Sequence, residues 1–435
     1  MLKKTTIALM ISVLFFATAL ADDKTERAIV NAVEQNMPTA LATLERSVNI
    51  NSDTKNFAGV KQVGEIYGAE LKALGFDVQW IDGADFNRAG HLVADRGIQK
   101  PKMGLKILLI GHLDTVFAKS DNFQTYEKLP GGNVKGPGIT DMKGGDVIII
   151  AAVRALKVAG VLDNISLKIV MTGDEESSGR PLSKSKAALI EAAIWADIAL
   201  GFEDGDGNIK TAVTSRRGSV DWHLTVTGRA AHSSQIFTSD VGYGAVLEAA
   251  RILNAYREQL SDIPNLSFNP GRIVGGTQIT HEKGKSTSTT FGKNNVVAQT
   301  LMVTGGIRAI SPKQLADAKA KMQAITKNNL HHTSAVLTFR DGYPPMAPTD
   351  GNAKLLALYS DISQSLGYGK IVAVDPRRAG AADISFTAKY VDGALDGLGL
   401  MGTGGHTKDE TADMTSFQKN TEKAAILIYR LSLED

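Results

Sequence analysis

The sequence predicts an α/β protein with a mixed, mostly parallel sheet and a smaller inserted α+β domain. Two observations carry this prediction. Short apolar strands alternate with helical segments from about residue 61 to residue 203, the pattern of an α/β layer. From about residue 217 the order changes to βαββαβ, which suits a separate domain. The length of 435 residues is also too great for a single hydrophobic core.

The larger domain is predicted from short apolar runs with helical segments between them. Its strands are expected at Lys106–Ile110, Ser166–Met171 and Ile194–Phe202, and its helices at Val147–Leu156 and Ser183–Ala193. An apolar-periodic helix at Phe417–Leu433 is expected to pack back on this domain. In open sheets of this kind, ligands bind beyond the carboxyl ends of the strands.

The inserted domain begins with Val220–Val226, where apolar and polar residues alternate as in a half-buried strand. The elements expected after it are a helix at Val241–Leu260, strands at Arg272–Val274 and Asn295–Val303, a helix at Ser311–Lys327 and a strand at Ala335–Arg340. We therefore expect one domain from residues 22–216 and 341–435 and a second from residues 217–340.

Composition excludes several classes of protein. Hydrophobic residues make up 43% of the chain and charged residues 22%, which is typical of a folded chain. Lys and Arg number 48 against 46 Asp and Glu, so a broad basic surface for nucleic acid is not expected. The chain has 0 Cys, so any metal must be bound by nitrogen and oxygen ligands.

The first 21 residues have the pattern of a secretory signal peptide. Lys3 and Lys4 precede an apolar run from Ile7 to Ala21, which ends in Ala19-Leu20-Ala21. A membrane anchor is the alternative, but a run of 15 residues is shorter than the roughly 20 that span a bilayer. We expect cleavage after Ala21 and a periplasmic or secreted mature protein without a membrane anchor.

The residues with chemical potential follow apolar strands. His112 and Asp114 come directly after one strand, where positions i and i+2 point to the same face. His112 could therefore bind a metal ion, and Asp114 could orient its imidazole ring by a hydrogen bond. The alternative is a turn at the end of the strand, in which the histidine is structural and makes its hydrogen bonds within the fold. Glu203 follows another strand, and His406 follows Gly404-Gly405.

Two further segments carry carboxylates. Asp141 lies in the glycine-rich segment 136–145, which could cradle a phosphate but lacks the Walker spacing, and Asp141 could also cap a helix. Asp174, Glu175 and Glu176 are adjacent, and they repel one another unless a cation or a proton intervenes. A solvated acidic turn is the alternative. Together with the two histidines, these carboxylates suit zinc or a similar divalent ion.

Seven segments, in this order along most of the chain, resemble one family. They are GHLDTVF, GPGITDMKGG, TGDEESSG, GFED, GRAAHSS, NNVV and GGH. The family is that of the dizinc metallopeptidases, which includes glutamate carboxypeptidase, aminoacylase and succinyl-diaminopimelate desuccinylase, and the chain looks most similar to glutamate carboxypeptidase. The resemblance implies a zinc-exopeptidase-like catalytic domain and an inserted lid domain that commonly dimerises.

The resemblance also implies roles for individual residues. Asp141 would bridge two Zn²⁺ ions, with His112 and Glu203 completing one ion's shell and Glu176 and His406 the other's. Glu175 would be the general base, and Asp114 would orient His112. His232 would stabilise the oxyanion, and Asn295 and Arg308 would bind the substrate's terminal carboxylate. The alternatives are an interface histidine for His232, a structural salt bridge for Arg308, and Asp204 replacing Glu203.

The sequence departs from the family at Gly306, where an Asp often lies two residues before the arginine. The remaining histidines match no ligand position and are expected to be structural or surface residues: His91, His223, His281, His331 and His332.

The function expected is that of a secreted zinc carboxypeptidase, a homodimer through its lid, that cleaves a small peptide or acyl-amino-acid with a free carboxylate. An N-acyl-amino-acid amidohydrolase or dipeptidase could share the same site. A hypothesis from another class, an inactive periplasmic peptide-binding relative, would be expected to lack the base or a ligand. Here the base and all ligand positions are filled. A third class, a phosphate- or nucleotide-binding enzyme, rests only on the glycines around Asp141.

Overall fold

The computed structural model describes residues 3–96, 104–282 and 286–434, and side chains from residue 24 onward. The predicted export segment, residues 1–21, therefore lies outside the described side chains. The chain forms two compact units: unit 1 is Met1–Thr214, Thr349–Val374 and Ala382–Asp435, and unit 2 is Ser215–Pro348 and Asp375–Ala381. Unit 2 thus extends past the expected boundary at residue 340 and includes a short later segment.

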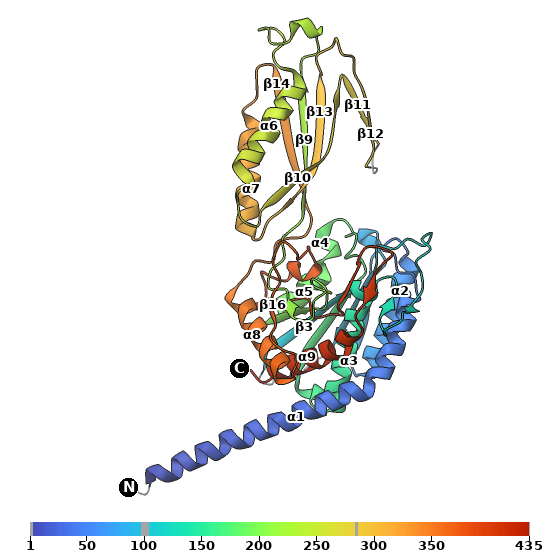
Figure 1. Ribbon diagram of the computed structural model, residues 1–435, viewed down its shortest axis with the longest axis vertical. Helices are drawn as coiled ribbons and strands as arrows, with labels where there is room; N and C mark the ends of the chain where they lie inside the picture. The colour runs from blue at the N-terminus through green and yellow to red at the C-terminus, as the bar shows by residue number, and fades with distance from the viewer. Residues whose placement is uncertain (1–2, 97–103, 283–285, 435) are drawn as a thin grey trace. The chain divides into compact units, whose positions relative to one another are not determined.

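Unit 1 is built on a six-stranded sheet with the order β1-β2-β6-β3-β7-β16 (Figure 1). Pairings β6–β3, β3–β7 and β7–β16 are parallel, and β1–β2 and β2–β6 are antiparallel, which confirms the predicted mixed, mostly parallel sheet. The strands are β1 (Asp77–Asp82), β2 (Gly90–Asp95), β3 (Lys106–His112), β6 (Ser166–Thr172), β7 (Ile198–Gly201) and β16 (Gly393–Leu395).

Helices pack around this sheet. The central one, α3, is buried along most of its length and contacts α1 and α9, so its nearly continuous apolar sequence is explained by neighbours on several sides. The helices are α1 (Lys3–Val48), α2 (Phe57–Ala73), α3 (Gly144–Val158), α4 (Leu182–Ser185), α5 (Ala187–Trp195), α8 (Asp350–Ser365) and α9 (Thr415–Leu431). Short strands complete the unit: β4 (Glu127–Lys128), β5 (Val134–Lys135), β8 (Thr211–Ala212), β15 (Val372–Ala373), β17 (Gly402–Thr403) and β18 (Thr411–Ala412).

Two predicted elements of unit 1 differ from the structure. The strand expected from Ile194 begins at Ile198, because Ile194 and Trp195 still belong to α5. An apolar run shared by a helix end and a strand carries no change of periodicity to separate them. The helix expected at residues 183–193 is two helices, α4 and α5, separated at Lys186, whose side chain is fully buried.

Unit 2 contains a four-stranded antiparallel sheet with the order β10-β13-β9-β14. Helices α6 and α7 lie along one side of it (Figure 1), over a core that includes Trp222, Leu224 and Val303. The elements are β9 (Val220–Gly228), α6 (Gly244–Leu260), β10 (Ser267–Gly276), β13 (Thr300–Arg308), α7 (Pro312–Lys327) and β14 (Thr333–Asp341). This is the predicted βαββαβ order.

Two features of unit 2 were not predicted. The strand expected at Asn295–Val303 lies at Thr300–Arg308, so Asn295 is in the preceding loop. A hairpin of β11 (Gln278–His281) and β12 (Ser288–Phe291) connects β10 to β13. Within the part of the chain that the structure describes, no helix has the length and apolar character needed to cross a membrane.

Candidate metal centre

The candidate site lies where three parallel strands of unit 1 end. His112 is the last residue of β3, Glu175 and Glu176 follow β6, and Glu203 follows β7. Because β6, β3 and β7 are parallel neighbours, their carboxyl ends meet at one edge of the sheet. The segment Ile139–Lys143, before α3, brings Asp141 to the same edge.

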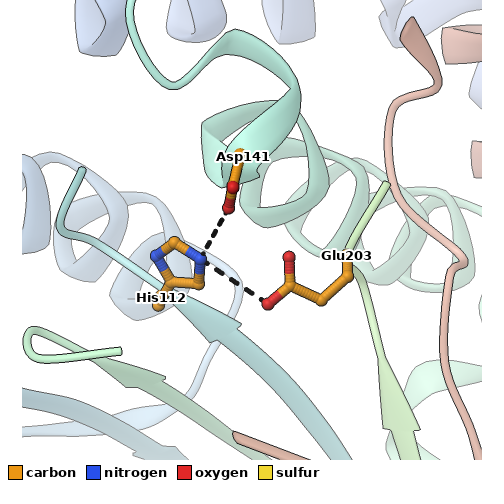
Figure 2. A group of neighbouring side chains, drawn as sticks. All are labelled: His112, Asp141 and Glu203. Atoms are coloured by element: carbon orange, nitrogen blue, oxygen red, sulfur yellow. Dashed lines mark hydrogen bonds and ion pairs between the residues drawn. The ribbon is translucent and has the colours of Figure 1, made fainter. Parts of the chain in front are cut away.

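Two groups of ligand atoms share Asp141. In one group, Nε2 of His112 lies 3.0 Å from Asp141 Oδ1 and 3.6 Å from Glu203 Oε1 (Figure 2). In the other, Nε2 of His406 lies 2.9 Å from Asp141 Oδ2 and 3.2 Å from Glu176 Oε2. Each group could hold a metal ion, and Asp141 presents a different oxygen to each. The structure therefore brings together all the residues expected to be ligands.

The donor set fits a pair of divalent cations. Imidazole nitrogens and carboxylate oxygens are ligands that zinc accepts, and a carboxylate can bridge two ions. Oε1 of Glu176 is buried and has no hydrogen-bond partner among the described residues, so it has capacity for a further contact. Within the described ranges, neither Lys nor Arg forms an ion pair with Asp141, Glu176 or Glu203.

Three acids of the cluster have raised pKa values, whereas hydrogen bonds to His112 and His406 overcome burial and hold the pKa of Asp141 below its usual range. Burial raises the pKa of Glu203 and of Glu175 well above the usual range. Burial and the charge of Asp141 raise the pKa of Glu176 to about 7. Removing carboxylates from water disfavours their charged form, and a nearby cation reverses this effect. For Glu175, Glu176 and Glu203, the effect of burial on the pKa therefore outweighs that of the two histidines.

The two histidines respond in the opposite direction. Burial opposes protonation of His112, but Glu203 and the hydrogen bonds to Asp114 and Asp141 raise its pKa well above the usual range. Hydrogen bonds to Asp141 and Glu176 raise the pKa of His406 to about 11. Protons on these imidazoles supply positive charge in the metal-free chain. Metal binding would release them, because an imidazole ligand must be neutral.

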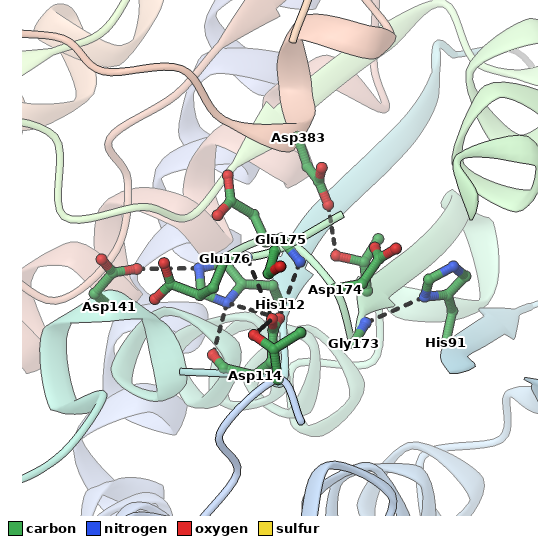
Figure 3. Close-up of polar contacts among 12 residues, drawn as sticks. His91, His112, Asp114, Asp141, Gly173, Asp174, Glu175, Glu176 and Asp383 are labelled. Atoms are coloured by element: carbon green, nitrogen blue, oxygen red, sulfur yellow. Dashed lines mark hydrogen bonds and ion pairs between the residues drawn. The ribbon is translucent and has the colours of Figure 1, made fainter. Parts of the chain in front are cut away.

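Asp114 is the contact between His112 and the acidic turn (Figure 3). Its backbone oxygen lies 3.0 Å from His112 Nδ1. Its carboxylate accepts hydrogen bonds from the backbone N–H groups of Glu175, at 3.0 Å, and Glu176, at 3.2 Å, and from Thr54 Oγ1 at 2.6 Å. Asp114 therefore contacts the imidazole through its backbone oxygen, and its carboxylate fixes the turn that carries two acidic residues of the site.

The three adjacent carboxylates are separated by their partners. Asp174 points away from the cluster and forms a buried ion pair with Lys186, whose Nζ lies 2.7 Å from Asp174 Oδ1 and 2.9 Å from Asp383 Oδ1. Burial disfavours the charged form of Asp174, but Lys186 lowers its pKa below the usual value. Asp174 is thus a structural acid with its own cation, whereas Glu175 and Glu176 belong to the site.

Sequence reasoning missed Glu410. Its Oε1 accepts backbone N–H bonds from Thr140, at 2.8 Å, and Asp141, at 3.1 Å, and its Oε2 accepts one from Gly138 at 2.9 Å. Glu410 therefore fixes the backbone that presents Asp141. In a single sequence nothing separates the buried Glu410 from its exposed neighbour Asp409.

Asp396 was also missed. It is buried, and its Oδ1 accepts hydrogen bonds from the backbone N–H groups of Glu203, at 3.3 Å, and Gly397, at 2.7 Å. Asp204, the alternative ligand, is in neither ligand group, whereas Glu203 is.

The other predicted site residues belong to unit 2. His232 is exposed, and its Nδ1 lies 2.8 Å from Ser234 Oγ. The backbone N–H of Ser233 donates to Asn295 O at 2.9 Å, so His232 and Asn295 lie on adjacent strands of backbone. Arg308 ends β13 and is exposed. It forms no ion pair within the described residues, so the alternative of a structural salt bridge has no partner there.

A mostly parallel sheet whose strand ends carry paired imidazole and carboxylate ligands, together with a separate α+β unit, defines a metal-dependent hydrolase. The model of Peptidase family M20/M25/M40 matches residues 108–430, and the chain belongs to this family. The predicted resemblance is therefore confirmed, and the protein is a hydrolytic enzyme.

The relatives agree with this assignment. The chain is 26% identical over 436 residues to carboxypeptidase G2 of Pseudomonas sp. (strain RS-16), covering 98% of both chains. It is 24% identical to a succinyl-diaminopimelate desuccinylase of Halorhodospira halophila, covering 65% of this chain and 71% of the relative.

Solved structures show the same fold. An aminopeptidase from Bacillus cereus has a TM-score of 0.71 at 19% identity, over 90% of this chain and 98% of its own. A dinuclear metal-binding peptidase from Bacillus subtilis has a TM-score of 0.60 at 15% identity, over the same shares, 90% and 98%.

Proposed function

We propose that the protein is a zinc-dependent carboxypeptidase that hydrolyses the amide bond to a C-terminal amino acid with a free carboxylate. We propose glutamate as the amino acid that is released. The observation that carries the proposal is the pair of ligand groups that share Asp141, with Glu175 directly before the ligand candidate Glu176 in the chain. The similarity to carboxypeptidase G2 along nearly the whole chain supports glutamate as the released residue.

The residues of unit 1 would hold two zinc ions: His112 and Glu203 on one, Glu176 and His406 on the other, and Asp141 on both. When bound, such ions polarise the scissile carbonyl and lower the pKa of an attacking water. Asp114 holds His112 in position for this role, and Glu410 holds the backbone of Asp141. These supporting contacts restrict the ligands to one geometry.

Glu175 would be the general base. Its carboxylate would take a proton from the attacking water and deliver that proton to the nitrogen of the leaving amine. Its burial and raised pKa favour holding a proton between these two steps. The hydrogen bond from its own backbone N–H to Asp114 fixes its place next to the ligand Glu176.

We propose that three residues of unit 2 bind the substrate. Arg308 and Asn295 would bind the terminal carboxylate, because a guanidinium fork and an amide both donate to carboxylate oxygens. His232 would donate to the oxyanion that forms at the scissile carbonyl. These assignments rest on the resemblance of the surrounding motifs and on the exposure of the side chains.

A second candidate function is supported by the desuccinylase relative. An N-acyl-amino-acid amidohydrolase or dipeptidase would use the same ligands and the same base. Hydrolysis of folate-like acyl-glutamates, N-acetyl amino acids and dipeptides, measured together with the zinc content, separates the two candidates. Failure to release glutamate from any acyl-glutamate would rule out the carboxypeptidase assignment.

We also propose export and dimerisation. The pattern of residues 1–21 supports cleavage after Ala21 and a periplasmic or secreted enzyme. The described side chains of α1 that pack in the core run from Ile29 to Val48, beyond the proposed cleavage point. Unit 2 would form the dimer contact. Cell fractionation, N-terminal sequencing of the mature protein and light scattering test these three points.

A further inference from the structure

A cavity lies on the face of the unit 2 sheet opposite α6 and α7. Along β9, Trp222 and Leu224 are buried in the core, so His223 between them points to the other face. Strand pairing aligns Arg272, Thr304, His223 and Thr338 in one row across the sheet. The next row along the strands on this face is Asn269, Gly306, Asp221 and Arg340.

The two rows form part of the lining of a cavity of about 640 Å³, to which His281 of β11 also contributes. A volume of this size is in the range of small-molecule sites. A side chain at Gly306 would meet nothing within 4 Å, so the middle of the second row is open.

Arg272 in this cavity has unused hydrogen-bond donors. Its Nε and Nη1 are buried, and neither has a hydrogen-bond partner within the described ranges. A guanidinium does not lose its proton in a protein, so the charge persists. A buried polar group without a partner is unfavourable and calls for an explanation, of which a bound ion is one.

The cavity is positively charged overall. Arg272 and Arg340 face a single acid, Asp221, and within the described residues neither arginine forms an ion pair with it. Burial, together with the charges of His281 and Arg272, lowers the pKa of His223. The lowered pKa of His223 agrees with an excess of positive charge around the imidazole.

We propose that this cavity binds a small organic carboxylate, at a site separate from Arg308. The guanidinium groups and the amide of Asn269 supply donors that match carboxylate oxygens. Asp221 on the wall disfavours phosphate, whose charge is concentrated on one small group, more than a dicarboxylate whose two charges lie further apart, because like charges in one cavity repel. Nothing in this proposal depends on turnover, so it stands apart from the proposed hydrolysis.

Arg308 lies beyond the edge of this cavity. It points to the same face of the sheet, two residues beyond Gly306 along β13, which corresponds to about 7 Å of strand. It does not line the cavity. The two cations therefore define two places for carboxylates on one sheet.

Calorimetric titration of the full-length, metal-loaded protein with glutarate tests the proposal. We expect wild type and Arg308→Gln to bind glutarate through the cavity, and Arg272→Gln to bind it at least about tenfold more weakly. Arg340→Gln, an exposed substitution, should weaken binding in the same direction. Arg257→Gln removes an exposed charge from α6, outside the cavity, and is the matched control. Equal affinity in Arg272→Gln and Arg257→Gln overturns the proposal.

Thermal unfolding separates a binding role from a structural one. Because Arg272 is an unpaired cation, Arg272→Met should melt at or above the wild-type temperature and lose the stabilisation by glutarate. Melting well below the Arg257→Gln control would assign Arg272 to the fold and contradict the proposal. Glutaramide, the neutral analogue, should not bind, and tighter binding of inorganic phosphate than of glutarate would overturn the choice of a carboxylate.

Discussion

Two groups of acids lie next to each other in unit 1, and they differ in the source of their positive charge. Asp174 and Asp383 share the ammonium of Lys186, and all three side chains are buried. Within the described ranges, the ion pairs of Asp141, Glu176 and Glu203 are with two histidines, His112 and His406. The first group is complete within the chain. The second needs protons or metal ions.

The comparison teaches that an acidic run cannot be interpreted as one unit. Asp174 is a structural residue and Glu176 a ligand candidate, although they are two positions apart. The cavity of unit 2 is the reverse case, because there a cation, Arg272, lacks its anion. In each place the missing partner is the basis for the ligand that we propose.

The largest effect is expected from Asp141→Ala. Because Asp141 contacts both histidines through different oxygens, its removal should lower the metal content of both groups together and abolish turnover. Metal analysis after dialysis and the rate of acyl-glutamate hydrolysis measure this. Loss of only one ion would contradict a bridging role.

Glu175→Gln is expected to lower kcat by about 100- to 10,000-fold, the range typical of a general base. Its metal content should stay at the wild-type value, because Glu175 is in neither ligand group. Glu65→Gln, an exposed acid on α2, is the matched control. If the Glu175 variant loses metal instead, the division between base and ligand is wrong.

Lys186→Met removes the cation from the group formed by Asp174, Lys186 and Asp383. It leaves two buried carboxylates without their cation, so we expect the free energy of unfolding to fall by about 3–5 kcal/mol. Denaturant unfolding measures the loss. The double variant with Asp174→Asn should recover part of it, since one uncompensated charge is removed. A stability equal to wild type would show that Lys186 is dispensable.

Arg308→Gln should raise KM by roughly 10- to 100-fold with a smaller change in kcat, because a hydrogen-bonded charge on the substrate carboxylate contributes about 1.5–3 kcal/mol. Substrates whose terminal carboxylate is amidated should show no further loss in this variant. A KM close to wild type would move the carboxylate-binding role to another residue.

The smallest effect is expected from Glu410→Gln. One amide oxygen can still accept a hydrogen bond, but the NH₂ group cannot accept from a backbone N–H. The loop of Asp141 should therefore loosen, with a loss of roughly 10- to 100-fold in metal affinity, as for other residues that support ligands. Competition with a chelator measures this. Asp409→Asn, at the exposed neighbour, should leave metal affinity unchanged.

Much of the fold followed from local sequence. Apolar runs predicted β3 and β6, and alternation predicted β9, because burial on both faces or on one face leaves these patterns. The break at Lys186 and the β11–β12 hairpin were not predicted. The break at Lys186 involves a contact with the distant Asp383, which no local pattern records.

The sequence by itself determined the ligand candidates, since each follows an apolar strand or a glycine-rich segment, and their order matches one family. Only the tertiary structure decided which acids belong together. It paired Asp174 with Lys186, assigned Glu410 to the loop of Asp141, and left Arg272 without an anion. The physical reason is that the pKa and the role of a charge depend on its burial and its partners in space, which spacing along the chain does not record.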